Sequence, residues 1–108
     1  MLLYIQRTTI KIFQHDLKIS KRIAEKLQQK HGVKKEEVWE CFLNRTKGLL
    51  EDTRLDHQTD PPTLWFIAET DHGRLLKIVF IENTDGTYEI KTAYEPNEIE
   101  VKIYGQYA

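Results

Sequence analysis

Five side chains from residue 54 onward have the chemistry to bind an anion and to move a proton: Arg54, His57, Arg74, Lys91 and Tyr94. Arginine donates two parallel hydrogen bonds to a phosphate or carboxylate from its planar guanidinium, and histidine titrates near neutral pH without help from its surroundings. Lysine supplies a cation, or a base where neighbours lower its pKa, and tyrosine supplies a proton or a ring that stacks. These residue types therefore indicate a site that binds an anion and transfers a proton.

Each of the five side chains also has a purely structural explanation. Arg54 and Arg74 lie at predicted strand ends, where a charge commonly extends into solvent, and His57 lies in a predicted loop. Lys91 can be a solvated strand lysine, and Tyr94 a packing residue. If the last strand stays regular, alternation places Lys91 and Tyr94 on opposite faces of the sheet. The sequence leaves the functional and the structural explanations open.

Metal and cofactor sites have little support in the sequence. The acid-rich stretch 52–60 matches no cation-binding loop and lacks the bidentate glutamate of an EF-hand. The four histidines are scattered singly: His15, His31, His57 and His72. The chain has no glycine-rich phosphate loop and no nucleophile elbow. We therefore expect no metal and no cofactor.

Composition places the chain among single-domain globular proteins. It has 108 residues, of which 40% are hydrophobic and 31% charged, and its formal net charge is −1. No apolar run approaches the roughly 18 residues of a membrane-spanning helix, and the N-terminus lacks the pattern of a secretory signal. The single cysteine, Cys41, has no partner for an intramolecular disulfide. We expect a cytoplasmic protein with no membrane association.

Apolar periodicity predicts two helices in the first half of the chain. The first begins after Ser20, a good N-cap residue, and ends at Gly32, which suits a left-handed conformation. The second follows at once, with glutamates in its first turn, and closes near Gly48. Together they predict a helical hairpin.

From residue 49 the period changes from 3.6 to 2. The pattern predicts four antiparallel strands, over residues 49–54, 64–70, 74–82 and 87–93. Glycine-containing turns separate the last three, and Pro96 opens a terminal helix through about Tyr104. The fold class is α+β, with the helical hairpin packed on a mainly antiparallel four-stranded sheet. Residues 16–108 form the domain, and residues 1–15 an N-terminal arm or extra strand.

Several short motifs occur in an order and spacing that resemble one known family. They are Lys30-His31-Gly32-Val33, Glu36-Glu37-Val38, Asp52-Thr53-Arg54-Leu55-Asp56-His57, Phe66-Ile67-Ala68, Gly73-Arg74-Leu75-Leu76-Lys77-Ile78-Val79 and Thr92-Ala93-Tyr94-Glu95. From about Asp16 to the C-terminus the chain thus resembles the BrnT-type toxins. Longer runs, such as Asp60-Pro61-Pro62-Thr63-Leu64-Trp65, resemble a subgroup often labelled ADP-ribosyl-(dinitrogen reductase) hydrolase.

The resemblance implies a fold similar to the RelE ribonuclease toxins, metal-independent RNA cleavage, and neutralisation by a partner antitoxin that is expected to bind DNA. Arg54 and Arg74 match arginines of the family pattern. The chain departs from that pattern in two places. His57-Gln58-Thr59 stands where a tyrosine, a glycine and an acid are common, and Tyr94-Glu95 stands where arginine is common.

RNA cleavage by a 2′-hydroxyl requires a proton acceptor, cations on the phosphate and a proton donor. We expect Arg54, Arg74 and Lys91 to be the cations, and His57 or Tyr94 to donate the proton. The alternative is a non-catalytic protein-binding or regulatory module of the same fold. The net charge of −1 favours that alternative, because phosphate contacts dominate RNA affinity. A weaker third possibility is a hydrolase of ADP-ribose conjugates. The sequence also leaves open whether the chain forms a homodimer.

Overall fold

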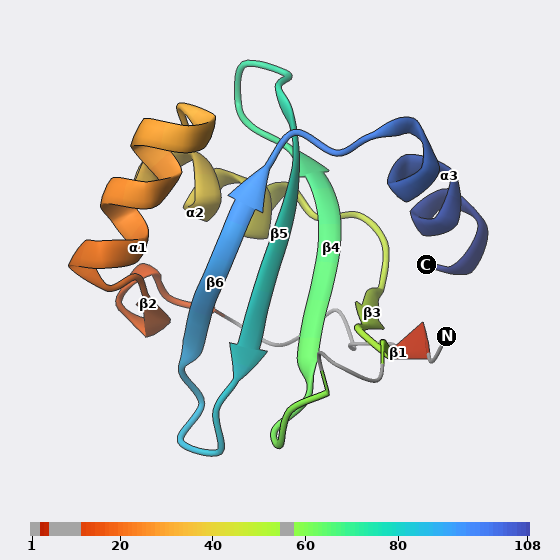
Figure 1. Ribbon diagram of the computed structural model, residues 1–108, viewed down its shortest axis with the longest axis horizontal. Coiled ribbons are helices and arrows are strands. Elements are labelled where there is room, and N and C mark those ends of the chain that lie inside the picture. Colours follow the sequence, from red (N-terminus) through yellow and green to blue (C-terminus); the bar gives the residue numbers. More distant parts are fainter. Residues whose placement is uncertain (1–2, 5–11, 55–57) are drawn as a thin grey trace.

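A computed structural model describes residues 3–4, 12–54 and 58–108. Its strands are β1 (Leu3–Tyr4), β2 (Leu17–Lys18), β3 (Leu49–Glu51), β4 (Thr63–Glu69), β5 (Leu75–Glu82) and β6 (Tyr88–Tyr94). Its helical segments are η1 (Gln14–Asp16), α1 (Lys21–Lys26), η2 (Leu27–His31), α2 (Lys35–Asn44) and α3 (Glu98–Tyr107). The α+β class predicted from the sequence is confirmed (Figure 1).

The strands of the described residues form one sheet in the order β1-β3-β4-β5-β6-β2. The four central strands are antiparallel neighbours, as predicted. The prediction of four strands was incomplete, because β1 pairs antiparallel with β3 and β2 pairs parallel with β6. β2 lies just before α1 in the sequence, and its partner β6 is about seventy residues away. Of the predicted arm 1–15, residues 1–2 and 5–11 lie outside the described residues.

The ends of the first helical segment follow from local chemistry. The Ser20 hydroxyl accepts a hydrogen bond from the amide of Ile23 at 3.2 Å, which is the expected N-cap. α1 continues into the π-helical turn η2, which ends at Gly32 with φ of 60°. Only glycine adopts that left-handed conformation without steric cost. α2 begins three residues later, so the predicted pair of helices is present.

The hydrophobic core lies between α2 and one face of the sheet. Phe66 of β4 and Phe80 of β5 are fully buried, and Phe42 of α2 packs edge-on against both rings, at 4.9 and 5.2 Å. Cys41 lies among these side chains, and burial raises the pKa of its thiol to about 12. Cys41 is therefore an inert packing residue. Figure 1 shows α2 behind the sheet and α1 beside β6.

α3 lies on the opposite side of the sheet, next to β4 (Figure 1). Its start is two residues later than Pro96 suggested, because Asn97 and Glu100 form a capping box in which each side chain accepts from the other's amide. The Tyr104 hydroxyl donates to the carbonyl of Gly48 at 2.8 Å and so fixes α3 near the start of β3. α3 covers only part of this face. We call the face opposite α2 the open face.

Candidate functional site

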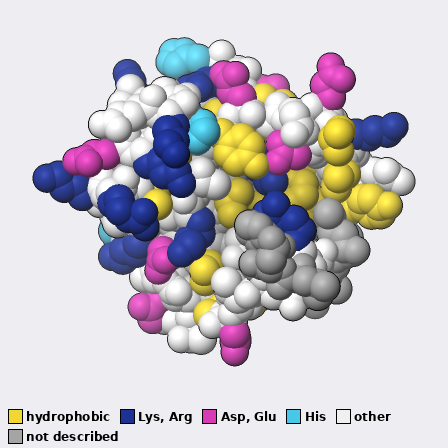
Figure 2. Space-filling view, viewed as in Figure 1, with side chains coloured by type: hydrophobic (Ala, Val, Ile, Leu, Met, Phe, Trp, Pro, Cys, Tyr) yellow, Lys and Arg dark blue, Asp and Glu magenta, His cyan; other side chains and the backbone are white. Residues whose placement is uncertain are grey.

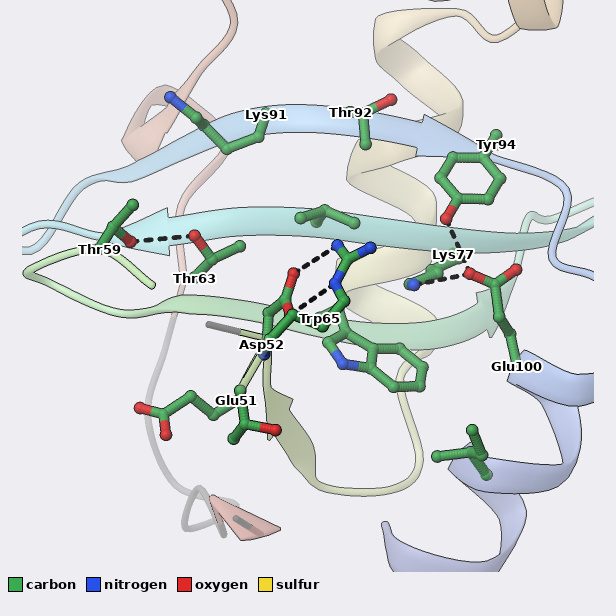
Figure 3. A pocket seen from close by; sticks show the side chains of 14 residues that line it. Glu51, Asp52, Thr59, Thr63, Trp65, Lys77, Lys91, Thr92, Tyr94 and Glu100 are labelled. Atoms are coloured by element: carbon green, nitrogen blue, oxygen red, sulfur yellow. Dashed lines mark hydrogen bonds and ion pairs between the residues drawn. The ribbon is translucent and has the colours of Figure 1, made fainter. Parts of the chain in front are cut away.

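A pocket of about 580 Å³ lies on the open face, bordered by β4, β5 and β6, by the segment after β3, and by α3. Cross-strand register places Trp65 opposite Val79, and Lys77 opposite Tyr94. Since directly paired residues share a face of a sheet, the open-face pocket has a continuous floor. Figure 3 shows the side chains of Lys77, Tyr94 and Glu100 pointing toward one another from β5, β6 and α3.

Lys77 is the central cation of the open-face pocket. Its Nζ lies 2.7 Å from Oε2 of Glu100, and only 13% of its side chain is exposed. The same ammonium lies 4.3 Å above the Trp65 ring, close enough for a cation–π interaction. Burial of a charge is costly unless the charge is paired. Glu100 and Trp65 therefore stabilise the ammonium in the floor of the pocket.

Glu100 accepts hydrogen bonds from three groups. Lys77 and the Tyr94 hydroxyl, at 2.7 and 2.8 Å, donate to Oε2, and the Asn97 amide donates to Oε1 at 3.0 Å. Burial alone would raise the pKa of Glu100, but the hydrogen bonds and the Lys77 charge outweigh it, so this pKa is lowered. Glu100 is therefore a carboxylate at neutral pH, and Oε2 is the point where an ammonium and a phenol meet.

Tyr94 has the opposite shift. Burial, the hydrogen bond to Glu100 and the charge of Glu100 raise the pKa of Tyr94 to about 12. The phenol therefore keeps its proton through the physiological range and donates a hydrogen bond to a carboxylate 2.8 Å away. The contrast between the two pKa shifts is of the kind that separates acid and base roles at a site. Lys77, Tyr94 and Glu100 thus form a proton-bearing cluster on the open face.

Arg54 and Asp52 form the opposite wall. Asp52 extends the β3–β4 ladder, since its amide donates to the carbonyl of Thr63 at 2.8 Å. Nε and Nη2 of Arg54 donate to the two oxygens of Asp52 at 3.0 and 2.7 Å, a bidentate pair. The Arg54 side chain is 64% exposed, whereas Asp52 is only 12% exposed. The guanidinium is thus oriented by a largely buried carboxylate and lines the pocket from the solvent side.

Lys91 reaches the same pocket through a β-bulge. Val79 pairs with Thr92 and Phe80 with Ile90, so Lys91 is the extra residue of β6. A regular strand would place Lys91 and Tyr94 on opposite faces of the sheet. Because β6 is not regular, both residues line the pocket (Figure 3). Lys91 is exposed and lies 3.3 Å from the carboxylate of Glu89. The bulge turns a lysine toward the site.

Arg74 lies apart from the open-face pocket. Its guanidinium donates to the carbonyls of His31 and Gly32, at 2.8 and 2.9 Å, and to Oε1 of Glu95 at 2.9 Å. The hydrogen bond with Glu95 is the main cause that raises the pKa of Arg74. These contacts attach the start of β5 to the end of η2. The expected grouping of Arg74 with the other cations is therefore not seen, because its donors are used within the fold.

The structure thus brings three of the five predicted residues together: Arg54, Lys91 and Tyr94 line one pocket. The fourth, Arg74, lies elsewhere, and His57 lies outside the described residues. Sequence reasoning missed Lys77 and Glu100. Lys77 had a signal, since it is the single charge inside the apolar run 75–81. For Glu100 the sequence holds no signal beyond its position three residues after Asn97, the N-cap of α3.

Over the part of the chain that the structure describes, the lining of the pocket carries as many acids as cations: Glu51, Asp52 and Glu100 against Arg54, Lys77 and Lys91. No group of three or more His, Cys, Asp or Glu suited to a metal ion occurs among the described residues. In the same part of the chain, no helix combines the length and the apolarity needed to cross a membrane. The functional groups that line the pocket are therefore paired charges, the phenol of Tyr94 and the indole of Trp65.

No protein-family model, curated protein or solved structure matches the chain significantly.

Proposed function

We propose that the chain is a BrnT-like, RelE-like endoribonuclease that cleaves single-stranded RNA by attack of a 2′-hydroxyl, without a metal ion. The observation that carries the proposal is the cluster of Lys77, Tyr94 and Glu100 beside the oriented guanidinium of Arg54. This cluster contains the proton acceptor, the proton donor and the cations that such a reaction needs. The motif resemblance supports the same chemistry.

In the proposed reaction the open-face pocket holds one phosphodiester. Arg54 and Lys91, the exposed cations of the lining, bind its non-bridging oxygens. Glu100 accepts the proton of the 2′-hydroxyl as the 2′-oxygen bonds to phosphorus. Lys77 lies within 2.7 Å of Glu100 and offsets the charge that develops on the phosphate. Tyr94 offers a ring face for an adjoining base.

The second proton transfer uses Tyr94. As the bond from phosphorus to the 5′-oxygen breaks, the phenol gives its proton to that oxygen. The phenolate then takes back a proton from protonated Glu100 across the 2.8 Å hydrogen bond, which restores the resting state. The products are a 2′,3′-cyclic phosphate and a 5′-hydroxyl end, and no proton is gained or lost. His57 is the alternative donor named by the sequence.

A toxin of this kind requires a partner that holds it inactive. The resemblance supports an antitoxin protein with a DNA-binding part, and a cytoplasmic location where RNA is the target. On this proposal the antitoxin covers the open-face pocket or blocks access to it.

Growth after induced expression in a bacterium tests the proposal. We expect wild type to arrest growth, and Arg54→Gln and Tyr94→Phe to relieve the arrest. Tyr107→Phe is the matched control, because Tyr107 is 48% exposed on α3 and does not line the pocket. Equal arrest by wild type and Tyr94→Phe, at equal protein levels, would contradict the assigned proton donor. No arrest by the wild type would contradict the toxin itself.

The second candidate is a non-catalytic protein-binding module. It is favoured by the ion pairs of the pocket cations: Arg54 with Asp52, Lys77 with Glu100, and Lys91 with Glu89. Cations paired in this way give weak attraction for phosphate. A salt titration of RNA binding separates the two candidates, since an RNA enzyme loses affinity steeply with salt. Absence of binding even at low salt would favour the protein-binding module.

A further inference from the structure

The charges of this nearly neutral chain are strongly segregated. Residues 1–50 hold eleven Lys and Arg against five Asp and Glu, whereas residues 51–108 hold five against twelve. Between Leu17 and Lys35 the only acid is Glu25, among seven Lys and Arg. Figure 2 shows Lys and Arg side chains gathered on the left, over α1. A net charge of −1 therefore conceals a strongly basic surface.

We define the basic strip as the cations of β2, α1 and η2: Lys18, Lys21, Arg22, Lys26 and Lys30. All are exposed except Lys26, which is half-buried. Among the described residues no carboxylate forms an ion pair with any of them. In this they differ from the cations of the open-face pocket, each of which has an acidic partner.

The helix dipole explains Lys26 and Lys30, which lie in the last turns of α1 and η2, but it does not explain the first cations of the basic strip. Lys21 and Arg22 occupy the first turn of α1, which holds no acid, although the helix dipole disfavours cations there. Arg22 and Lys26 are four residues apart on one helix, and like charges at that spacing are destabilising. A surface whose first cations weaken their own helix, and which forms no ion pair with a carboxylate of the described residues, is suited to an external polyanion.

The basic strip adjoins the open-face pocket at both ends of β6. At the start of β6, Lys18 pairs in register with Glu89, and Lys18, Arg22 and Lys91 line one hollow of about 380 Å³. Lys91 also lines the open-face pocket, so the two surfaces share this lysine. At the other end, the strip ends at Lys30, and the ring of the next residue, His31, lies 5.6 Å from that of Tyr94 in the pocket. A chain leaving the pocket across β6 therefore arrives on the basic strip.

We infer that the basic strip binds the phosphate backbone of a single-stranded RNA whose scissile linkage lies in the open-face pocket. This inference rests on the proposed function and names how its substrate is held. The strip supplies the salt-dependent affinity that the charge-balanced pocket lacks, and the pocket supplies the chemistry. RNA fits better than an acidic protein surface because stacking rings, Tyr94 and His31, border the path.

The test compares two variants of equal net charge. Lys18→Gln/Arg22→Gln removes two charges of the basic strip, and Lys47→Gln/Lys102→Gln removes two charges outside both surfaces. Lys102 is exposed on α3, which lies at the other side of the sheet from α1 (Figure 1). The probe is a fluorescein-labelled 12-nucleotide RNA with 2′-O-methyl groups, which binds without being cleaved. Fluorescence anisotropy gives Kd from 20 to 300 mM salt.

For a single strand each phosphate contact adds about 0.7 to the slope of log K against log salt. The strip variant should therefore lose about 1.4 from the slope and bind about 25-fold more weakly at 0.1 M salt, while the control variant keeps the wild-type values. Equal slopes for the strip and control variants overturn the inference and leave the proposed function standing. If the wild type shows no salt-dependent binding of the RNA, both the inference and the proposed function are overturned. Strip-dependent binding by a wild type that fails to cleave unmodified RNA supports the strip and overturns only the cleavage.

Discussion

The Lys77–Glu100 ion pair gives a prediction whose magnitude follows from its geometry. The two side chains are 13% and 17% exposed and 2.7 Å apart. Glu100→Gln removes the carboxylate and leaves the ammonium without a counter-charge. A hydrogen bond to a charged group contributes about 1.5–3 kcal/mol, and breaking a fully buried pair costs about 3–5 kcal/mol. Since some exposure remains and Trp65 still faces the ammonium, we expect a loss of about 2 kcal/mol.

Lys77→Met keeps the length of the side chain and its packing on Trp65. Glu100 then retains the hydrogen bonds from Tyr94 and from the Asn97 amide, so the expected loss is about 1.5 kcal/mol. The double variant has neither charge, and hence no uncompensated one. The double variant should lose about 2 kcal/mol of stability, which is less than the sum of the two single losses. The difference is a coupling energy of about 1.5 kcal/mol between Lys77 and Glu100.

Urea unfolding followed by tryptophan fluorescence and by circular dichroism measures the four free energies of this cycle. Coincidence of the two signals checks that the transition is two-state. Residues that do not interact give losses that add within about 0.3–0.5 kcal/mol. Additive losses for Lys77→Met and Glu100→Gln would therefore refute the ion pair as the centre of the site.

Three further predictions follow from single groups. Tyr94→Phe should remove from the ultraviolet titration one phenol that ionises near pH 12, whereas loss of a phenol that ionises near pH 10 would contradict its burial against Glu100. Because the folded-state pKa of Glu100 is lowered below the ordinary 4.5, the stability it adds is complete above pH 4.5 and is lost as pH falls through the folded value. The stability difference between wild type and Glu100→Gln should shrink in that acidic window, and a constant difference would count against the assignment. Arg74→Met should cost about 2–3 kcal/mol, because two backbone carbonyls and Glu95 lose a charged donor. It should leave RNA cleavage by the folded protein unchanged, and lost cleavage at unchanged stability would return Arg74 to the site.

The features that could be predicted from the sequence are those set by neighbouring residues. The N-cap at Ser20 and the left-handed Gly32 depend on contacts within a few residues, and both are present. The same holds for the turn at Gly73, whose φ is 82°. Strand alternation likewise placed β4 and β5 within one residue of their observed bounds.

The features that could not be predicted depend on contacts between distant residues. The face of Lys91 is set by a bulge in the pairing of β6 with β5, which no periodicity in β6 reveals. Arg74 binds carbonyls more than forty residues earlier in the chain, and Lys77 meets an acid twenty-three residues later. The neutral total charge hid the basic strip because an average over the chain says nothing about where the charges lie.

The most direct test of the central proposal is cleavage of single-stranded RNA by the purified chain in EDTA, with the product ends determined by mass spectrometry. We predict 2′,3′-cyclic phosphate and 5′-hydroxyl ends, no cleavage of RNA with 2′-O-methyl groups, and loss of cleavage in folded Arg54→Gln. Absence of cleavage, products with 3′-hydroxyl and 5′-phosphate ends, or full activity of Arg54→Gln would contradict the proposed open-face site.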